Sequence, residues 1–361
     1  MSGPFVLAAG GTGGHMVPAH VLACELMARG HEVHLVTDAR GLRFPGLFEG
    51  VPRTVVESGS VARSGLLALP KVALAVLRGW AAARTLFREI RPRAVIGFGG
   101  YPALPGLLAA VSMRLPSLIH EQNAVLGRVN RLLAPRVRAI ATSYPAVRGL
   151  DARLAARVRL TGNPVRAEVV AARDTLFDAH ASRLRLLVTG GSQGAAVLNS
   201  VVPAAVALLP ARVRARLDVV HQGRDEDAEA MKLAYAEAGV SAVIRAYFED
   251  LPREIAAAHL VVARAGASTV AELTVAGRPA VLVPLPIAAD DHQADNARAM
   301  AGAGGAVMVR QGEFTPARLA DILTAWLGDP DALAAAAEAA RALGRPDAAS
   351  ALADLVTETA E

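Results

Sequence analysis

Cysteine and aromatic residues are scarce in this sequence of 361 residues. Cys24 is the only cysteine, which excludes an intramolecular disulfide framework and any Cys-x-x-Cys metal site and fits a reducing compartment. Aromatic residues make up 4% of the chain, whereas 53% of its residues are hydrophobic. We therefore expect cores built from aliphatic strands and helix faces, and we do not expect extensive disorder.

Long uncharged apolar runs are also missing. The one candidate membrane segment, Leu66–Phe87, is interrupted by Lys71, Arg78 and Arg84. It should not span a bilayer, because charged side chains at the bilayer centre are costly. Residues 1–10 carry no basic region followed by a separate apolar run, so we interpret them as a first strand rather than a signal peptide.

Lysine is nearly absent, since Lys71 and Lys232 are the only two and arginine supplies the other basic charges. The net charge of +5 and the pI of about 9.9 fit anionic partners. An arginine bias also follows from genome composition, so both explanations stay open. We do not expect a nucleic acid partner.

Short apolar runs alternate with longer helical patterns along the whole chain, which is typical of βαβ units and parallel sheets. A chain of this length favours two domains. The predicted fold class is therefore α/β, with two Rossmann-like, doubly wound parallel-sheet domains that face a cleft. The expected strands are Pro4–Ala9, Glu32–Thr37, Ala94–Phe98, Ser117–Glu121, Ala139–Thr142, Arg185–Thr189, Leu217–His221, Ala242–Ala246, Leu260–Ala263 and Ala280–Pro284.

An internal repeat supports the two domains. The run PFVLAAGGTGG from residue 4 resembles LRLLVTGGSQG from residue 184, at an offset of 180 residues. The turn-forming cluster Gly162-Asn163-Pro164, which follows the strand-like run Val158–Thr161, divides the chain into domains 1–162 and 163–361. The pattern of residues 331–361 predicts two helices with a break near Gly344-Arg345-Pro346. One possible arrangement is that these helices pack back toward the first domain.

The first glycine-rich loop, Gly10 to Gly14, follows a strand and begins a helix, so its backbone N–H groups suit a phosphate or a sugar. A dinucleotide-binding loop is the rival interpretation, with Asp38 as the ribose-binding acid, but it requires glycine where Met16 stands. His15 follows the loop directly and lies at the amino terminus of the expected helix. The helix dipole there disfavours imidazolium and keeps a neutral base available near pH 7.

The second loop, Gly190 to Gly194, matches the Gly-x-Ser-x-Gly elbow of serine hydrolases around Ser192. The histidines that a hydrolase would need follow in the chain as His221, His259 and His292. A repeated phosphate loop explains both glycine-rich segments, whereas an elbow explains only one. We therefore favour the phosphate loop.

Two further segments of the second half carry polar side chains. Arg264 to Glu272 follows a strand and starts a helix, where the Glu272 carboxylate is placed to accept ribose hydroxyls while the helix end faces a diphosphate. Asp290 to Asn296 offers acids for Mg²⁺, but the run lies in a loop, and we favour hydrogen bonds to sugar hydroxyls. No other set has metal-ligand spacing, so no metal or cofactor is expected.

Taken together, these motifs resemble the MurG family of transferases, in glycosyltransferase family 28. The motifs that carry the resemblance are GGTGGH, GFGGYP, HEQNAVLGRVN, GNPVR, GGSQGA, ARAGASTVAE and DDHQADNA, between residues 10 and 297. The resemblance implies a GT-B fold and inverting transfer of GlcNAc from UDP-GlcNAc to the C4 hydroxyl of MurNAc in lipid I, which gives lipid II. It also implies that no metal takes part.

The resemblance implies roles for individual residues. Thr12, Gly13 and Gly14 would contact donor and acceptor, His15 would accept the proton, and Asn123 would hold the sugar near it. Glu121 is a rival base. In the second half, the implied donor-binding residues are Arg166, Ser192, Phe248 against uracil, Ala267, Ser268, Thr269, Val270, Ala271, Glu272 at the ribose and Gln293 at GlcNAc.

Two departures affect only details of these contacts. Tyr247-Phe248-Glu249-Asp250 varies a segment that the family often fills with Phe-Ile-Asp-Asp, and His292 stands where some members have glutamine.

The stretch Arg63–Arg91 suits docking on an anionic leaflet, through Lys71, Arg78, Trp80 and Arg84. A buried amphipathic helix with snorkelling arginines is the alternative. The resemblance places the enzyme peripherally on the cytoplasmic face of the inner membrane, with cell-division or cell-wall synthesis proteins as further partners. The other functions considered are transfer to another lipid acceptor, UDP-GlcNAc 2-epimerisation, serine hydrolysis and non-catalytic UDP-sugar binding.

Overall fold

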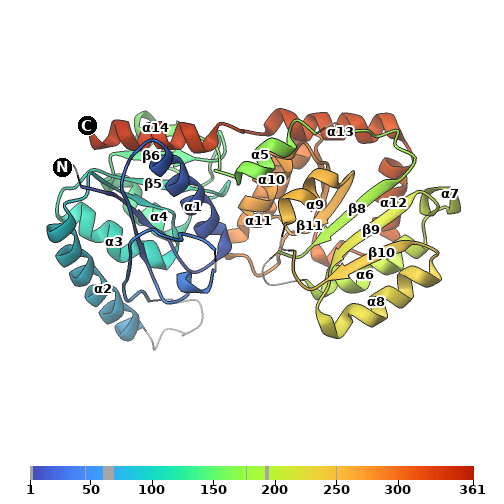
Figure 1. The fold of residues 1–361 in the computed structure, drawn as a ribbon, viewed down its shortest axis with the longest axis horizontal. Helices are drawn as coiled ribbons and strands as arrows, with labels where there is room; N and C mark the ends of the chain where they lie inside the picture. Colours follow the sequence, from blue (N-terminus) through green and yellow to red (C-terminus); the bar gives the residue numbers. More distant parts are fainter. Residues whose placement is uncertain (1–2, 45, 60–68, 176, 192–194, 249) are drawn as a thin grey trace. The chain divides into compact units, whose positions relative to one another are not determined.

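The chain folds into two compact α/β units in a computed structural model (Figure 1). The structure describes residues 3–44, 46–59, 69–175, 177–191, 195–248 and 250–361. The first unit comprises Met1–Val165 together with Pro346–Glu361, and the second comprises Arg166–Arg345.

The first unit is built on a seven-stranded parallel sheet in the order β3-β2-β1-β4-β5-β6-β7. Its strands β1 and β4 have no polar side chain because both faces of the sheet are covered. In β1, Phe5 and Leu7 join one core while Val6 and Ala8 join the other. The strands are β1 (Phe5–Ala8), β2 (Val33–Thr37), β3 (Arg53–Val55), β4 (Ala94–Gly97), β5 (Ser117–Glu121), β6 (Ala139–Thr142) and β7 (Val158–Leu160).

Helices cover both faces of this sheet. One face carries α1 and α14, whose apolar side chains share a core with β1, and the other carries α2, α3 and α4. The helices of the first unit are α1 (Gly13–Ala28), α2 (Leu69–Ile90), α3 (Gly100–Ser112), α4 (Arg128–Leu133) and α14 (Ala348–Ala360).

The second unit has a six-stranded parallel sheet in the order β10-β9-β8-β11-β12-β13. Its strands are β8 (Leu184–Thr189), β9 (Leu217–Gln222), β10 (Ser241–Arg245), β11 (Leu260–Ala263), β12 (Ala280–Leu282) and β13 (Ala306–Met308). Its helices are α5 (Ala167–Ala172), α6 (Ala196–Ala207), α7 (Ala211–Arg214), α8 (Asp225–Glu237), α9 (Leu251–Ala257), α10 (Ala267–Ala276), α11 (His292–Gly302), α12 (Pro316–Leu327) and α13 (Pro330–Leu343).

The predicted repeat is confirmed, because β1 and β8 occupy the same place in their sheets. Each is followed by a glycine-rich turn, and in each sheet the strand order reverses beside it, at β1/β4 and at β8/β11. In open parallel sheets such a reversal creates a crevice at the carboxyl ends of the strands. Each unit therefore has its own binding edge. The expected strands are all present, the strand-like run Val158–Thr161 forms β7, and β3 and β13 were not predicted.

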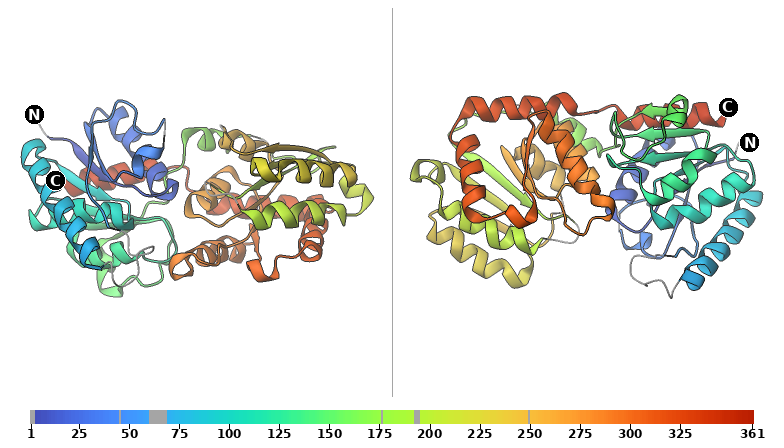
Figure 2. Two further views of the ribbon diagram at one scale, coloured as in Figure 1. Left: turned by 90° about the horizontal axis from the view of Figure 1, so that it is seen from below. Right: turned by 180° about the vertical axis from the view of Figure 1, so that it is seen from behind.

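The last helix, α14, belongs to the first unit (Figure 2). It packs against α1, and Leu352 and Val356 are fully buried in the core that includes β1. The predicted break between the last two helices is confirmed, since α13 ends at Leu343 and α14 starts at Ala348.

Candidate active site

The first glycine-rich loop connects β1 to α1 at the carboxyl edge of the first sheet. Gly10 has no room for a side chain, because a Cβ there would lie 2.7 Å from Pro102 and 2.9 Å from an Asp38 oxygen. Gly11 adopts φ +82°, which disfavours other residues. Thr12 is the N-cap of α1, so Gly13 and Gly14 form the first turn. The loop thus exposes helix-terminal N–H groups, as a phosphate or sugar site requires.

His15 lies in the first turn of α1 and is half-buried. Its ring contacts the start of α3, since a Cβ on Gly100 would lie 3.1 Å from its Nε2. Gly100 has φ +69° and follows another left-handed glycine, Gly99. Two glycine-rich turns therefore meet at this imidazole.

Glu121 ends β5 and is 2% exposed. Its Oε1 accepts from the backbone N and Nδ2 of Asn123, at 3.0 and 3.2 Å. Its Oε2 accepts from the backbone N of Gly127 and from Nδ2 of Asn130, both at 2.8 Å. Burial raises the pKa of this carboxyl, and the four hydrogen bonds oppose that rise. The carboxylate organises the loop between β5 and α4.

The residues on either side of Glu121 hold neighbouring segments. His120 donates from Nε2 to the carbonyl of Gly162 at 2.9 Å, and its Nδ1 accepts from Gln122 Nε2 at 3.1 Å. Burial lowers the pKa of His120 to about 4. The Gln122 amide also donates to the carbonyl of Phe98, after β4, at 3.0 Å. The run from His120 to Asn123 thus joins three segments at the sheet edge.

Asp38 follows β2, where a dinucleotide fold would place its ribose-binding acid. One oxygen accepts from the backbone N of Gly41 at 3.2 Å. The other accepts from Arg40 at 2.7 Å and from Ser58 Oγ at 3.0 Å. Met16 is 1% exposed in the core. Asp38 is therefore a structural acid, and the dinucleotide interpretation has no support here.

In the second unit, two predicted donor-binding residues form an ion pair. Glu272, on α10, is 4% exposed, and its Oε1 accepts from Arg166 Nε at 3.1 Å and Nη2 at 2.8 Å. Burial raises the pKa of Glu272, and the Arg166 guanidinium opposes that rise. Because both bonds go to Oε1, Oε2 keeps its capacity to accept.

The start of α10 follows the carboxyl end of β11. Ala267 to Ala271 form its first turns, after the N-cap Gly266. Among the residues that the structure describes, the buried Oγ of Ser268 and Nε of Arg264 have no hydrogen-bond partner. These groups at the sheet edge keep hydrogen-bonding capacity for a ligand.

Gln293 lies in the first turn of α11, after the loop that follows β12. Its Oε1 accepts from the backbone N of Leu285 at 3.0 Å, so its NH₂ group is the part left to contact a ligand. His292 bonds the carbonyl of Ala289 through Nδ1 at 2.7 Å.

Phe248 and Ser192 are two further residues predicted to contact the donor. Phe248 is 5% exposed, so its ring belongs to the interior, whereas the neighbouring Tyr247 is 71% exposed. No motif marks Tyr247 as a contact residue, and only its exposure identifies it. Ser192, with Gln193 and Gly194, lies outside the described residues.

The histidines that a serine hydrolase would use lie apart. His221 is buried, with Nδ1 2.8 Å from the Tyr235 hydroxyl, and burial lowers its pKa to about 3. His259 precedes β11, and its Nδ1 accepts from the backbone N of Arg185 near the start of β8. His259 therefore lies at the amino end of β8, whereas Gly190 and Gly191 follow the carboxyl end of that strand.

The residues predicted to associate with a membrane lie on α2, in two environments. Lys71 and Arg78 are exposed, beside Leu74 and Leu77, which are 48% and 59% exposed. Trp80 Nε1 and Arg84 Nη1 instead donate to Ser112 Oγ on α3, at 3.2 and 2.9 Å. No helix within the described residues is long and apolar enough to cross a bilayer.

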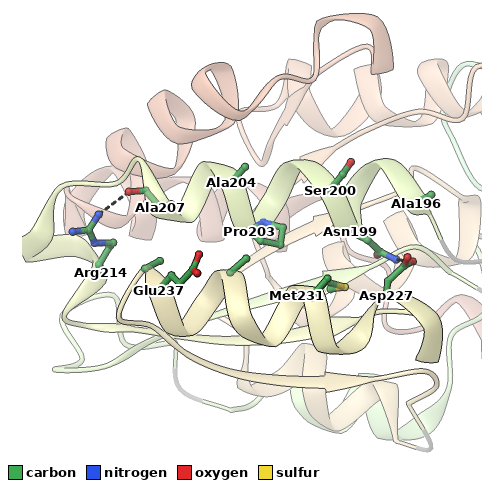
Figure 3. Close-up of a pocket in the computed structure, with 13 residues that line it drawn as sticks. Ala196, Asn199, Ser200, Pro203, Ala204, Ala207, Arg214, Asp227, Met231 and Glu237 are labelled. Atoms are coloured by element: carbon green, nitrogen blue, oxygen red, sulfur yellow. Dashed lines mark hydrogen bonds between the residues drawn. The ribbon is translucent and has the colours of Figure 1, made fainter.

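A separate groove of about 610 Å³ lies between α6 and α8 (Figure 3). Alanine side chains, Pro203 and Met231 line most of it, and Asn199 donates to Asp227 at one end, at 2.8 Å. It contains none of the predicted site residues. The described residues also contain no cluster of three His, Cys, Asp or Glu side chains suited to a metal ion.

Comparison with known proteins gives consistent matches. Residues 5–142 match the glycosyltransferase family 28 N-terminal domain and residues 185–352 the C-terminal domain. A Rhodospirillum centenum protein named UDP-N-acetylglucosamine--N-acetylmuramyl-(pentapeptide) pyrophosphoryl-undecaprenol N-acetylglucosamine transferase is 53% identical, over 98% of this chain and 93% of its own length. The crystal structure of Acinetobacter baumannii MurG matches with a TM-score of 0.78 and 30% identity over 99% of both chains. A putative UDP-N-acetylglucosamine 2-epimerase from Listeria monocytogenes, at 14% identity and a TM-score of 0.68 over 99% of this chain and 98% of its own, shares the fold alone.

Proposed function

Because this chain belongs to glycosyltransferase family 28, we propose that it transfers GlcNAc from UDP-GlcNAc to the C4 hydroxyl of MurNAc in lipid I. The products are lipid II and UDP, in peptidoglycan synthesis. The fold is GT-B, and the enzyme is a UDP-GlcNAc-dependent N-acetylglucosaminyltransferase. The observation that carries the choice of substrates is the 53% identity to a transferase of that name across 98% of the chain.

His15 is the general base of this reaction. It receives the proton of the acceptor hydroxyl while that oxygen attacks the anomeric carbon and UDP leaves with the bonding electrons, so the configuration inverts. Its position in the first turn of α1 supports this role, because the helix dipole keeps an imidazole neutral there. Thr12, Gly13 and Gly14 bind the substrates beside it.

Glu121 is a positioning residue rather than the base. All of its hydrogen-bonding directions are used within the loop from Asn123 to Asn130, and it is 2% exposed. A general base must reach the proton that it removes. Glu121 instead orients Asn123, which holds the sugar near His15.

The second unit binds the donor. The N–H groups of Ala267 to Thr269 at the start of α10 and the Ser268 hydroxyl contact the diphosphate, with Ser192 in the matching glycine-rich loop. Val270 and Ala271 lie in the next turn, where the Val270 N–H donates to the Gly266 carbonyl at 3.0 Å. Glu272 accepts the ribose hydroxyls through Oε2, while Arg166 holds Oε1. Gln293 donates its NH₂ group to GlcNAc.

The uracil contact combines two neighbouring residues. Phe248, which the family resemblance assigns to uracil, is buried and supports the wall of the site. Tyr247 has the exposed ring face that stacking requires. Tyr247 therefore covers the base, and Phe248 fixes the backbone beneath it.

The enzyme works peripherally on the cytoplasmic face of the inner membrane, where its lipid-linked acceptor lies. Exposed Leu74 and Leu77 between Lys71 and Arg78 support docking through α2. Cell-division or cell-wall synthesis proteins are further partners of an enzyme at this place.

The decisive experiment is incubation with radiolabelled UDP-GlcNAc and a short-chain lipid I analogue, with and without EDTA. We expect one GlcNAc to enter the lipid product, at a rate that EDTA does not change. Absence of labelled lipid would overturn the proposed function. Loss of transfer in EDTA, restored by a divalent cation, would overturn only its metal independence.

A further inference from the structure

The turn before α11 contains two successive left-handed residues that are not glycine. Asp290 has φ 54° and ψ 22°, and Asp291 has φ 57° and ψ 27°. This conformation is disfavoured for residues that carry a Cβ, and aspartate is among the few that tolerate it. Two in a row persist only where neighbouring contacts fix them.

Arg310 provides such a contact. It follows β13, and its Nη1 and Nη2 donate to the two oxygens of Asp291 at 2.9 and 2.8 Å. A two-pronged guanidinium–carboxylate pair fixes direction as well as distance. Arg298, on α11, lies 3.9 Å from the same carboxylate, too far for a comparable bond.

The segment after β13 also fixes the start of the loop that runs from Val283 to Asp291. Gln311, next to Arg310, accepts from Arg264 Nη2 at 2.7 Å. Arg264 in turn donates to the carbonyls of Val283 and Pro284, at 3.1 and 3.3 Å. Two consecutive residues therefore hold both ends of the loop from Val283 to Asp291.

Gln293 is the functional side chain that this loop places. It stands two residues after Asp291, and its Oε1 accepts from Leu285 inside the loop. If the turn at Asp291 relaxes, the start of α11 and the Gln293 amide move with it. The sugar-facing NH₂ group is thus fixed only while the loop keeps its shape.

We infer that Arg310 is a positioning residue for the donor sugar: its pair with Asp291 maintains the strained turn and thereby orients Gln293 toward GlcNAc. This inference rests on the proposed function, in which Gln293 contacts that sugar. Arg310 itself touches neither the nucleotide nor the reacting atoms.

The test compares Arg310→Gln, Arg310→Lys and Asp291→Asn in the full-length protein, with Arg318→Gln as the matched control, since Arg318 is exposed on nearby α12. Equilibrium binding of UDP-GlcNAc, UDP-GalNAc and UDP is measured by calorimetry. For Arg310→Gln we expect UDP-GlcNAc to bind about tenfold more weakly, as for the loss of one oriented hydrogen bond. UDP should bind as in wild type, and the preference for UDP-GlcNAc over UDP-GalNAc should shrink.

Arg310→Lys should fall between wild type and Arg310→Gln, because an ammonium keeps the charge but lacks the rigid pair of donors that matches both carboxylate oxygens. The double variant Arg310→Gln/Asp291→Asn should bind no worse than either single variant. Unchanged UDP-GlcNAc binding in Arg310→Gln, or an equal loss for UDP, would overturn the inference. A wild-type protein that binds UDP-GlcNAc but transfers nothing would instead overturn the proposed function.

Discussion

Glu121 and His15 stand at the same edge of the first sheet, and their different surroundings support the different roles that we propose for them. Glu121 accepts four hydrogen bonds within its own loop, whereas the His15 ring packs on the glycine turn before α3. A carboxylate whose two oxygens already accept hydrogen bonds holds the donor groups in place. An imidazole at a helix amino terminus is suited to taking a proton.

For His15→Ala we expect kcat to fall about 10²- to 10⁴-fold, the usual contribution of a general base, with the KM for UDP-GlcNAc almost unchanged. The acid limb of the kcat/KM profile against pH should disappear. Glu121→Gln should keep that limb while weakening acceptor use, because its amide NH₂ would face the donors of Gly127 or Asn130. If the acid limb disappears in Glu121→Gln and remains in His15→Ala, then Glu121 is the base and His15 is not.

His120 makes the first unit sensitive to acid. Burial lowers its pKa to about 4 in the folded protein, against about 6.5 when unfolded. Its contribution to stability is complete above pH 6.5 and is lost as the pH falls toward 4, on the order of 3 kcal/mol in total. Urea unfolding of His120→Gln should therefore depend less on pH in this range than unfolding of wild type. The control His180→Gln removes an exposed histidine and should follow wild type; a parallel response in all three proteins would contradict the assignment.

Among the elements, α2 has two sets of side chains in different surroundings. Leu74 and Leu77 are exposed between basic side chains, while Trp80 and Arg84 bind Ser112 on α3. The first set is available to a membrane, and the second joins two helices of the first unit.

We expect Leu74→Glu/Leu77→Glu to abolish cosedimentation with anionic liposomes and to change the unfolding free energy by less than about 0.5 kcal/mol, as for other exposed sites. Trp80→Ala/Arg84→Ala should mainly lower stability. Leu233→Glu on α8, at a residue 61% exposed, is the matched control and should bind liposomes normally. Normal liposome binding by the Leu74/Leu77 variant would exclude this docking surface.

Buried strands such as β1, β4 and β11 could be predicted from sequence because each is a continuous apolar run. β3 and β13 are three-residue strands at the edges of their sheets, and β3 exposes two of its three side chains, so neither stands out as an apolar run. The glycine loops and His15 were predicted because local patterns specify them. The bonds from Glu121 to Asn130 and from Asp291 to Arg310 join residues 9 and 19 positions apart, and only the tertiary fold selects such partners.

At the scale of the whole chain, α14 completes the core of the first unit. Leu352→Asp would place a carboxylate in that core, where Leu352 is fully buried, and should destabilise the first unit by at least about 3 kcal/mol. UDP binding by the second unit should survive. Glu358→Gln, on the exposed side of the same helix, is the control. Calorimetric melting with and without UDP distinguishes the two units, because UDP should raise only the melting temperature of the second unit. If Leu352→Asp also lowers the melting temperature of that UDP-stabilised transition, the two units do not melt separately and the prediction is wrong.

The place of α14 also has a consequence for synthesis on the ribosome. Residues 1–165 emerge first, but one wall of their core comes from residues 346–361, which are made after the entire second unit. Domains commonly fold as they emerge, in order from the amino terminus. The second unit can therefore be complete while the first unit still exposes the apolar surface that α14 covers, and that surface stays open until residues 346–361 have emerged.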